Sequence, residues 1–183
     1  MKSGHGKRGN GHRKNHVKKS RNYSSSEVER VPMKIIFLEI HGVLLHATSH
    51  LIARLNQKDA VAYAPSVEAL NYIINNTKAQ IVITSSWREA GLENLQNKFK
   101  EWEVVTTSFD RTPTGQGKGN SILKWMAMDG AGEPESFVII DSSSKEYGRM
   151  LLPFLIETDG DKGGLNMEQA KRAVEMLNGE KQK

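Results

Sequence analysis

The sequence predicts an α/β fold with a mainly parallel sheet, and three observations lead to this prediction. Short segments of consecutive apolar residues alternate along the chain with longer segments whose apolar residues recur at helical spacing. Such uninterrupted apolar runs are typical of parallel strands that are covered on both faces. Polar and charged residues follow several of these runs directly. We therefore expect a three-layer sandwich with helices on both sides of the sheet.

The first half of the predicted fold contains two strands around one helix. Residues 34–39 (KIIFLE) form the first predicted strand, because four consecutive apolar residues suit a buried position. The first predicted helix covers 66–77, where apolar residues recur at helical spacing. Ser66 is its expected N-cap, and Glu68 favours the positive end of its dipole. Residues 80–84 (QIVIT) form the second predicted strand.

The remaining elements continue the same alternation. The predicted helices cover 92–102, 118–128 and 166–177, and the predicted short strands cover 104–105, 137–140 and 154–157. The last helix opens with a capping box from Asn166 to Gln169, and Gly179 ends it. The predicted folded domain therefore spans 32–178, with 1–31 and 179–183 as the two tails.

Residues 1–31 differ in composition from the rest of the chain. The whole sequence has a net charge of +5, but residues 1–31 carry +7 and the remainder −2. This segment has too few apolar residues to offset the entropy of ordering, so we expect a disordered tail. Clustered basic residues without neighbouring acids predict sequence-independent binding to nucleic acid. The residues expected to make these contacts are Lys7, Arg8, Arg13, Lys14, Lys18, Lys19 and Arg21.

Other features of the sequence limit its chemistry and its compartment. No cysteine is present, which excludes disulfides and thiolate metal sites. No run approaches the roughly 18 apolar residues that a membrane helix needs. The charged N-terminus lacks the apolar stretch of a secretory signal. We therefore expect a cytoplasmic protein with no membrane partner.

Three segments that follow predicted strands carry the residues suited to chemistry. They are 39–44 (EIHGVL), 84–88 (TSSWR) and 141–144 (DSSS), and Lys118 lies between the last two. In a doubly wound sheet, ligands bind beyond the carboxyl ends of the strands. Hydroxyls and free N–H groups hold phosphoryl oxygens, a lysine neutralises their charge, and carboxylates hold magnesium. The segments therefore predict a phosphate-handling site, although the hydroxyls after the second strand are equally suited to cap a helix.

The order of these motifs resembles that of haloacid dehalogenase (HAD) phosphohydrolases. In that superfamily an apolar strand leads into D-x-D-G-V-L, a second strand leads into [ST]-S-S-W-R, a lysine follows, and a later strand ends in D-D. The segment VITSSWR (82–88), with Thr158-Asp159 and Gly164-Leu165, is most similar to small bacterial and phage HAD domains associated with RNA repair. The resemblance covers roughly residues 33–178 and implies an HAD-like Rossmannoid fold. Because only about 20 residues (45–65) precede the next helix, no large cap domain is expected.

The resemblance also implies a phosphate site and a magnesium site. Thr84 (or Ser85) and Lys118 stand where the family binds the phosphoryl group. Glu39 and Asp141 stand where the family binds Mg²⁺. The substrate class implied by an uncapped site is a macromolecule, such as a nucleic-acid end.

The catalytic positions depart from the family's pattern. Glu39 stands at the position of the nucleophilic aspartate and is one methylene longer, and a shift of about 1 Å in a reacting atom can cost about 100-fold in rate. His41 stands at the position of the general acid/base, where it titrates near neutral pH but adds no negative charge. Ser142 replaces the second acid of the later pair, beside Asp141. We therefore expect any Mg²⁺ site to be weakened.

These departures leave three functions open. The first is an HAD-like protein with an impaired phosphatase site that binds nucleic acid through its basic tail. The second is an active magnesium-dependent phosphatase acting on phosphorylated nucleic-acid ends. The third is a structural or interaction module of a larger protein or ribonucleoprotein assembly, in which the tail aids solubility or binds another acidic partner.

Two neighbouring features have simpler expected explanations. Trp87 is expected to pack in the core rather than to stack on a base. Asp159 and Asp161 do not match the twelve-residue ligand pattern of a calcium loop, so a turn is expected there.

Overall fold

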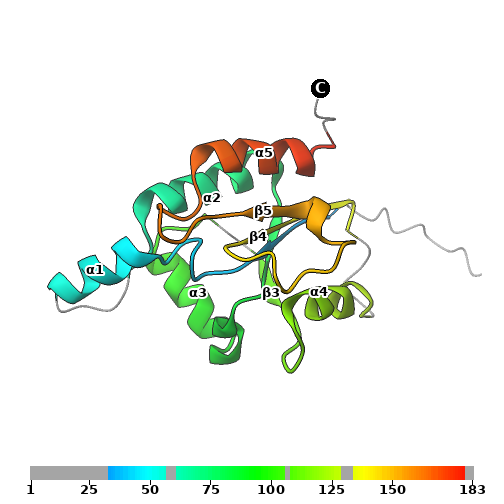
Figure 1. Ribbon diagram of the computed structural model, residues 1–183, viewed down its shortest axis with the longest axis horizontal. Coiled ribbons are helices and arrows are strands. Elements are labelled where there is room, and N and C mark those ends of the chain that lie inside the picture. Colours follow the sequence, from blue (N-terminus) through cyan, green and yellow to red (C-terminus); the bar gives the residue numbers. More distant parts are fainter. Residues whose placement is uncertain (1–32, 57–60, 106–107, 129–133, 180–183) are drawn as a thin grey trace, which may run out of the picture. The chain divides into compact units, whose positions relative to one another are not determined.

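The computed structural model describes a five-stranded parallel sheet with helices on both faces (Figure 1). The described residues are 33–56, 61–105, 108–128 and 134–179. The strands are β1 (Lys34–Leu38), β2 (Gln80–Ile83), β3 (Phe109–Arg111), β4 (Ser136–Asp141) and β5 (Leu155–Glu157). Their order across the sheet is β3-β2-β1-β4-β5. The predicted parallel α/β architecture is therefore confirmed.

The helices are α1 (Ala47–Asn56), α2 (Ala64–Thr77), α3 (Leu92–Glu101), α4 (Lys118–Met126) and α5 (Met167–Leu177), with short 3₁₀ helices η1 (Ser86–Ala90) and η2 (Leu152–Phe154). The helices α2, α3, α4 and α5 form the two outer layers, whereas α1 extends away from the sheet (Figure 1). Buried residues of α2, α3 and α5 share one apolar cluster with the sheet. Buried residues of α4 share a second cluster with its other face. Among the described residues, no helix has the length and apolar character needed to cross a membrane.

The central strand β1 shows why the apolar runs are uninterrupted. Ile36 and Leu38 belong to the cluster on the α2 and α5 side, whereas Ile35 and Phe37 belong to the cluster on the α4 side. The ring of Phe37 meets that of Trp125 on α4 edge to face, with centroids 5.4 Å apart. Because successive strand residues point to opposite faces, a strand covered on both sides needs an apolar residue at every position.

The strand order places a topological switch point between β1 and β4. The chain leaves β1 towards β2 and β3, then crosses to β4 and continues to β5 on the other side. Loops that leave β1 and β4 therefore diverge, and ligands bind in the crevice between them. The described residues between β1 and α2 form a loop and the ten-residue helix α1, so no large cap domain is inserted there.

The predicted strand at 104–105 was wrong, because the third strand lies at Phe109–Arg111. Val104 donates its N–H to Phe99 O (2.9 Å) and so closes the end of α3. Val105 donates its N–H to the Asn71 side chain (2.8 Å). β3 pairs with β2 at the edge of the sheet, and its sequence (FDR) contains only one apolar residue. An edge strand tolerates polar residues, so the apolar pattern could not identify it.

The other elements agree with the predictions in position, with two exceptions at the start of the domain. The helix α1 was not predicted. The helix α2 begins at Ala64, and Ser66 donates its hydroxyl to Gly163 O (3.0 Å) instead of capping the helix. At the far end, the predicted capping box of Asn166 and Gln169 is confirmed.

The turn after β1 depends on Gly42. Its φ is +77°, and a Cβ at this position would lie 2.3 Å from Ser142 Oγ. Its carbonyl accepts a hydrogen bond from the Thr158 hydroxyl (2.7 Å). Gly42 therefore brings the loops after β1, β4 and β5 into contact.

We expect Gly42→Ala to lower the free energy of unfolding by about 2–4 kcal/mol, because it combines positive-φ strain with overpacking against Ser142. Urea denaturation measures this change. Gly148→Ala is the matched control, since a Cβ at Gly148 would meet nothing within 4 Å. Equal stabilities of the two variants would contradict the proposed role of Gly42.

Candidate functional site

The ends of β1, β2 and β4 bring three polar side chains to one edge of the sheet. Glu39 directly follows β1, Thr84 directly follows β2, and Asp141 is the last residue of β4. The pairing continues past the strand ends, because Glu39 N–H donates to Ile140 O (3.0 Å) and Thr84 N–H donates to Leu38 O (2.9 Å). Hydrogen bonds of the sheet backbone therefore fix the main-chain positions of these three residues.

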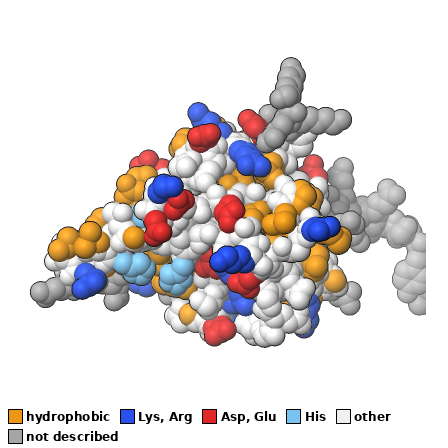
Figure 2. Space-filling view, viewed as in Figure 1, with side chains coloured by type: hydrophobic (Ala, Val, Ile, Leu, Met, Phe, Trp, Pro, Cys, Tyr) orange, Lys and Arg blue, Asp and Glu red, His pale blue; other side chains and the backbone are white. Residues whose placement is uncertain are grey.

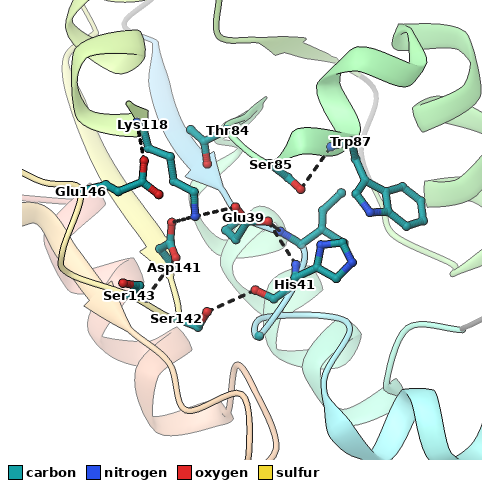
Figure 3. A network of polar contacts seen from close by, with 12 residues as sticks. Glu39, His41, Thr84, Ser85, Trp87, Lys118, Asp141, Ser142, Ser143 and Glu146 are labelled. Atoms are coloured by element: carbon teal, nitrogen blue, oxygen red, sulfur yellow. Dashed lines mark hydrogen bonds and ion pairs between the residues drawn. The ribbon is translucent and has the colours of Figure 1, made fainter. Parts of the chain in front are cut away.

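Lys118 joins the two carboxylates (Figure 3). Its Nζ lies 2.7 Å from Glu39 Oε2 and 2.8 Å from Asp141 Oδ2. The side chain of Asp141 is fully buried, that of Glu39 is 7% exposed and that of Lys118 is 20% exposed. Lys118 is the first residue of α4, and its backbone N–H donates to the Glu146 carboxylate (3.1 Å). The start of α4 thus delivers a cation to the switch point.

The second oxygen of Glu39 binds the protein's own backbone. Oε1 accepts from the N–H groups of Ile40 (2.8 Å) and His41 (3.2 Å). Both oxygens of the carboxylate are therefore engaged, one by Lys118 and one by the turn that follows β1. Backbone N–H groups that point into such a turn are otherwise available to an anionic ligand.

Asp141 is held by three donors. Besides Lys118, the Tyr147 hydroxyl donates to Oδ2 (2.6 Å) and the Ser143 N–H donates to Oδ1 (3.0 Å). Burial and the charge of Asp141 raise the pKa of Tyr147 above its ordinary value, so this hydroxyl stays protonated as a donor. A buried carboxylate without such partners would be strongly destabilising.

The carboxyl pKa values in this cluster shift in opposite directions. Burial alone would raise the pKa of Glu39, but Lys118 and hydrogen bonds from Ser85 and Ile40 lower it below its ordinary value. Burial raises the pKa of Asp141, and the charge of Glu39 adds to this increase beyond what Lys118 and Tyr147 offset. The two carboxylates raise the pKa of Lys118 although burial opposes them. Glu39 and Lys118 are therefore both charged at neutral pH.

The two residues after β2 differ in their partners. Thr84 is fully buried, and its hydroxyl has no hydrogen-bond partner among the described residues. The Ser85 hydroxyl caps η1 by accepting from Trp87 N–H (3.3 Å). The Arg88 guanidinium donates to the carbonyls of Thr84 and Ser85 and so fixes this turn. The structure therefore leaves the buried Thr84 hydroxyl without a partner among the described residues and gives Ser85 the expected capping role.

His41 does not join the carboxylate cluster through its side chain. Its exposed ring lies beside His50 of α1 and beside Trp87, with centroid distances of 6.3 Å and 6.0 Å. Trp87 is half-buried against the core and packs on Trp102 (5.5 Å), so the expected packing role of Trp87 is confirmed.

The donor set does not match a divalent metal ion in the present arrangement. The Lys118 ammonium lies between the two carboxylate oxygens that a shared Mg²⁺ would contact. Ser142 donates its hydroxyl to His41 O (3.3 Å) and supplies no charge. Within the described residues, no cluster of three or more His, Cys, Asp or Glu side chains suits a metal. Asp159 accepts from the N–H groups of Asp161 and Lys162, which confirms the expected turn.

Three neighbours of the site had no signal in the sequence. Tyr147 and Glu146 lie in the loop after β4 without a motif to mark them, and His50 lies on a helix that was not predicted. Their roles depend on how the loops return to the sheet edge. The predicted nucleic-acid contacts, from Lys7 to Arg21, lie outside the described residues.

Comparison with protein-family models matches residues 35–170 to one family, described as the HAD domain in Swiss Army Knife RNA repair proteins. Neither the curated proteins nor the solved structures gave a match. The matched segment contains Glu39, Thr84, Lys118 and Asp141, and so includes the whole cluster at the switch point.

We expect Lys118→Met to lower the free energy of unfolding by about 3–5 kcal/mol near pH 7.5, since it leaves two buried carboxylates unpaired. In the natural protein the lowered pKa of Glu39 adds stability that is lost as the pH falls through that pKa. In the variant, burial and mutual repulsion raise both carboxyl pKa values in the folded state. The folded chain then binds more protons than the unfolded chain, so its stability falls as the pH rises.

Urea denaturation between about pH 4 and pH 8 measures this difference. The loss should be greatest at the alkaline end and shrink towards the acidic end. Lys162→Met is the matched control, because it removes an ion pair with Asp159 whose side chains are 83% and 51% exposed. A loss for Lys118→Met that is the same at every pH would contradict the electrostatic explanation.

Proposed function

Because the chain belongs to the family of HAD domains in Swiss Army Knife RNA repair proteins, we propose that it binds phosphorylated nucleic-acid ends with an impaired hydrolytic site. The phosphate lies at the switch point between β1 and β4, and the basic tail adds affinity for the rest of the strand. The observation that carries this proposal is the engagement of both Glu39 oxygens.

A nucleophile for phosphoryl transfer needs a free oxygen in line with the leaving group. Oε2 of Glu39 is ion-paired to Lys118, and Oε1 is hydrogen-bonded to Ile40 and His41. Attack requires the carboxylate to break one of these sets of contacts. Oε1 also occupies the N–H groups that would otherwise hold a phosphoryl oxygen. The longer side chain of Glu39 therefore disfavours turnover in two ways. It engages both carboxylate oxygens, and it takes up the N–H groups that would bind the phosphoryl group.

Three features support phosphate binding at the same place. Lys118 supplies an ammonium group, Thr84 supplies a buried hydroxyl without a partner, and Ser85 lies next to Glu39. The charges of Lys118 and Glu39 offset each other, so the cluster offers no net positive charge to an anion that binds alone. Any Mg²⁺ that accompanied the phosphate would bind weakly, because Lys118 already pairs with the two carboxylates that the metal would contact.

Two other functions have specific observations in their favour. An active magnesium-dependent phosphatase is favoured by the ion pair of Lys118 with Asp141, two positions that the resemblance assigns to the phosphate and magnesium sites. An interaction module is favoured by α1, where Leu51 and Leu55 are 56% and 74% exposed. Exposed apolar side chains of this kind mark interaction surfaces when they form a patch.

Phosphate release from 5′- and 3′-phosphorylated oligonucleotides with magnesium tests the proposal. The natural chain should release no phosphate above background, because Glu39 is not free to attack. The double variant Glu39→Asp/His41→Asp should gain magnesium-dependent activity, since it places the family's two carboxylates on a site that still binds phosphate.

Adding Asp141→Asn to the double variant provides the control and should abolish the gained activity. Turnover by the natural chain that Asp141→Asn removes would refute the impaired site and establish the active phosphatase. If neither the natural chain nor the double variant releases or binds phosphate, the interaction module becomes the favoured function.

A second prediction concerns the tail. Replacing Lys7, Arg8, Arg13, Lys14, Lys18, Lys19 and Arg21 by Gln keeps the length of the chain but removes seven charges. Affinity for single-stranded RNA should fall at low salt, and the slope of log K against log [salt], up to about −5 in the natural chain, should approach zero. Fluorescence anisotropy at several salt concentrations measures both quantities. An unchanged slope would exclude the tail as the electrostatic contact.

A further inference from the structure

Two exposed histidine residues lie close to the carboxylate cluster. His41 follows β1 two residues after Glu39, and His50 lies on α1. Their rings are parallel to within 5°, with centroids 6.3 Å apart. Figure 2 shows histidine side chains gathered on one face of the domain, next to the hydrophobic side chains of α1. Neither ring is used by the carboxylate cluster.

The position of His41 is fixed from both sides. Its backbone N–H donates to Glu39 Oε1 (3.2 Å), and its carbonyl accepts from the Ser142 hydroxyl (3.3 Å). The Trp87 ring lies 6.0 Å from the His41 ring at an angle of 62°, and Trp87 itself packs on Trp102. The His41 ring therefore projects from a rigid turn rather than from a free loop.

His41 donates its backbone N–H to Glu39, the residue that Lys118 contacts, so its ring lies next to the proposed phosphate site. Figure 3 shows Lys118 and His41 on opposite sides of Glu39. A phosphoryl group held by Lys118 and Thr84 would carry its nucleoside outwards, past His41. The residues that the nucleoside would meet there, His41 and His50, are both exposed and have parallel rings.

We infer that His41 and His50 form a stacking platform for the base of the terminal nucleotide, an inference that rests on the proposed function. Aromatic side chains, histidine included, stack on unpaired bases, and such stacking tolerates every base. His41 replaces the carboxylate with which the resemblance associates proton transfer. Its imidazole ring provides a flat surface at that position. The ligand is thus a phosphorylated nucleic-acid end with an unpaired terminal base.

A metal site between the two histidines does not account for the arrangement. Within the described part of the chain, the two rings have no shared ligand or contact beyond their parallel arrangement. The described residues also place no third ligand near them that would complete a metal cluster. Two parallel rings on exposed residues offer flat surface on which a planar base can stack.

Titration calorimetry with the full chain at about 0.5 M salt, which screens the basic tail, tests the inference. The ligands are a 5′-phosphorylated RNA trinucleotide, the same molecule with an abasic 5′ residue, and the dephosphorylated trinucleotide. The natural chain should bind the base-bearing ligand at least about 5-fold more tightly than the abasic one. His50→Ala should remove this preference, and His50→Phe should keep it because a flat ring remains.

Asn56→Ala, on the same helix, is the control and should leave the preference unchanged. Equal affinities for the base-bearing and abasic ligands, or a preference that survives His50→Ala, would overturn the stacking platform. If the dephosphorylated trinucleotide binds as tightly as the phosphorylated one while the base preference remains, the proposed phosphate site is refuted. The stacking platform is then supported. A chain that binds none of the three ligands would refute both.

Discussion

The ion pair of Lys118 with Glu39 and Asp141 is the interaction on which the rest of the site depends. Parallel pairing of β1 with β4 brings two carboxylates to one buried edge, where like charges repel and desolvation is costly. A single ammonium group compensates both, and it comes from the first residue of α4. The ion pair that stabilises the two buried carboxylates therefore also anchors α4, the helix that covers the second face of the sheet.

Much of this arrangement could be predicted from the sequence, for a simple geometric reason. Uninterrupted apolar runs identified the buried parallel strands, and parallel strands must end at the same edge, so Glu39, Thr84 and Asp141 had to lie near one another. The third strand was misplaced because an edge strand with one apolar residue has no pattern to detect. The helix α1 was missed because its Leu51 and Leu55 are exposed and so do not mark a buried face.

What the sequence could not supply was the conformation of individual side chains. The extra methylene of Glu39 allows its carboxylate to turn back onto Ile40 and His41, and nothing in the residue's identity requires that turn. Likewise, the contact of Tyr147 with Asp141 depends on how the loop after β4 returns to the sheet. Under the proposed function, the contacts that stabilise the buried charge of Glu39 would also oppose its use as a nucleophile, which is a common relation between stability and activity.

The contacts around Gly42 have a consequence for motion. His41 O, Gly42 O and Val43 O accept hydrogen bonds from Ser142, Thr158 and Leu165, so the loops after β1, β4 and β5 are joined at three successive carbonyls. Loops that share so many bonds open as one cooperative unit rather than separately. Amide protons in the three loops should then show a common free energy of opening in hydrogen exchange, and a ligand would enter when all three loops open together.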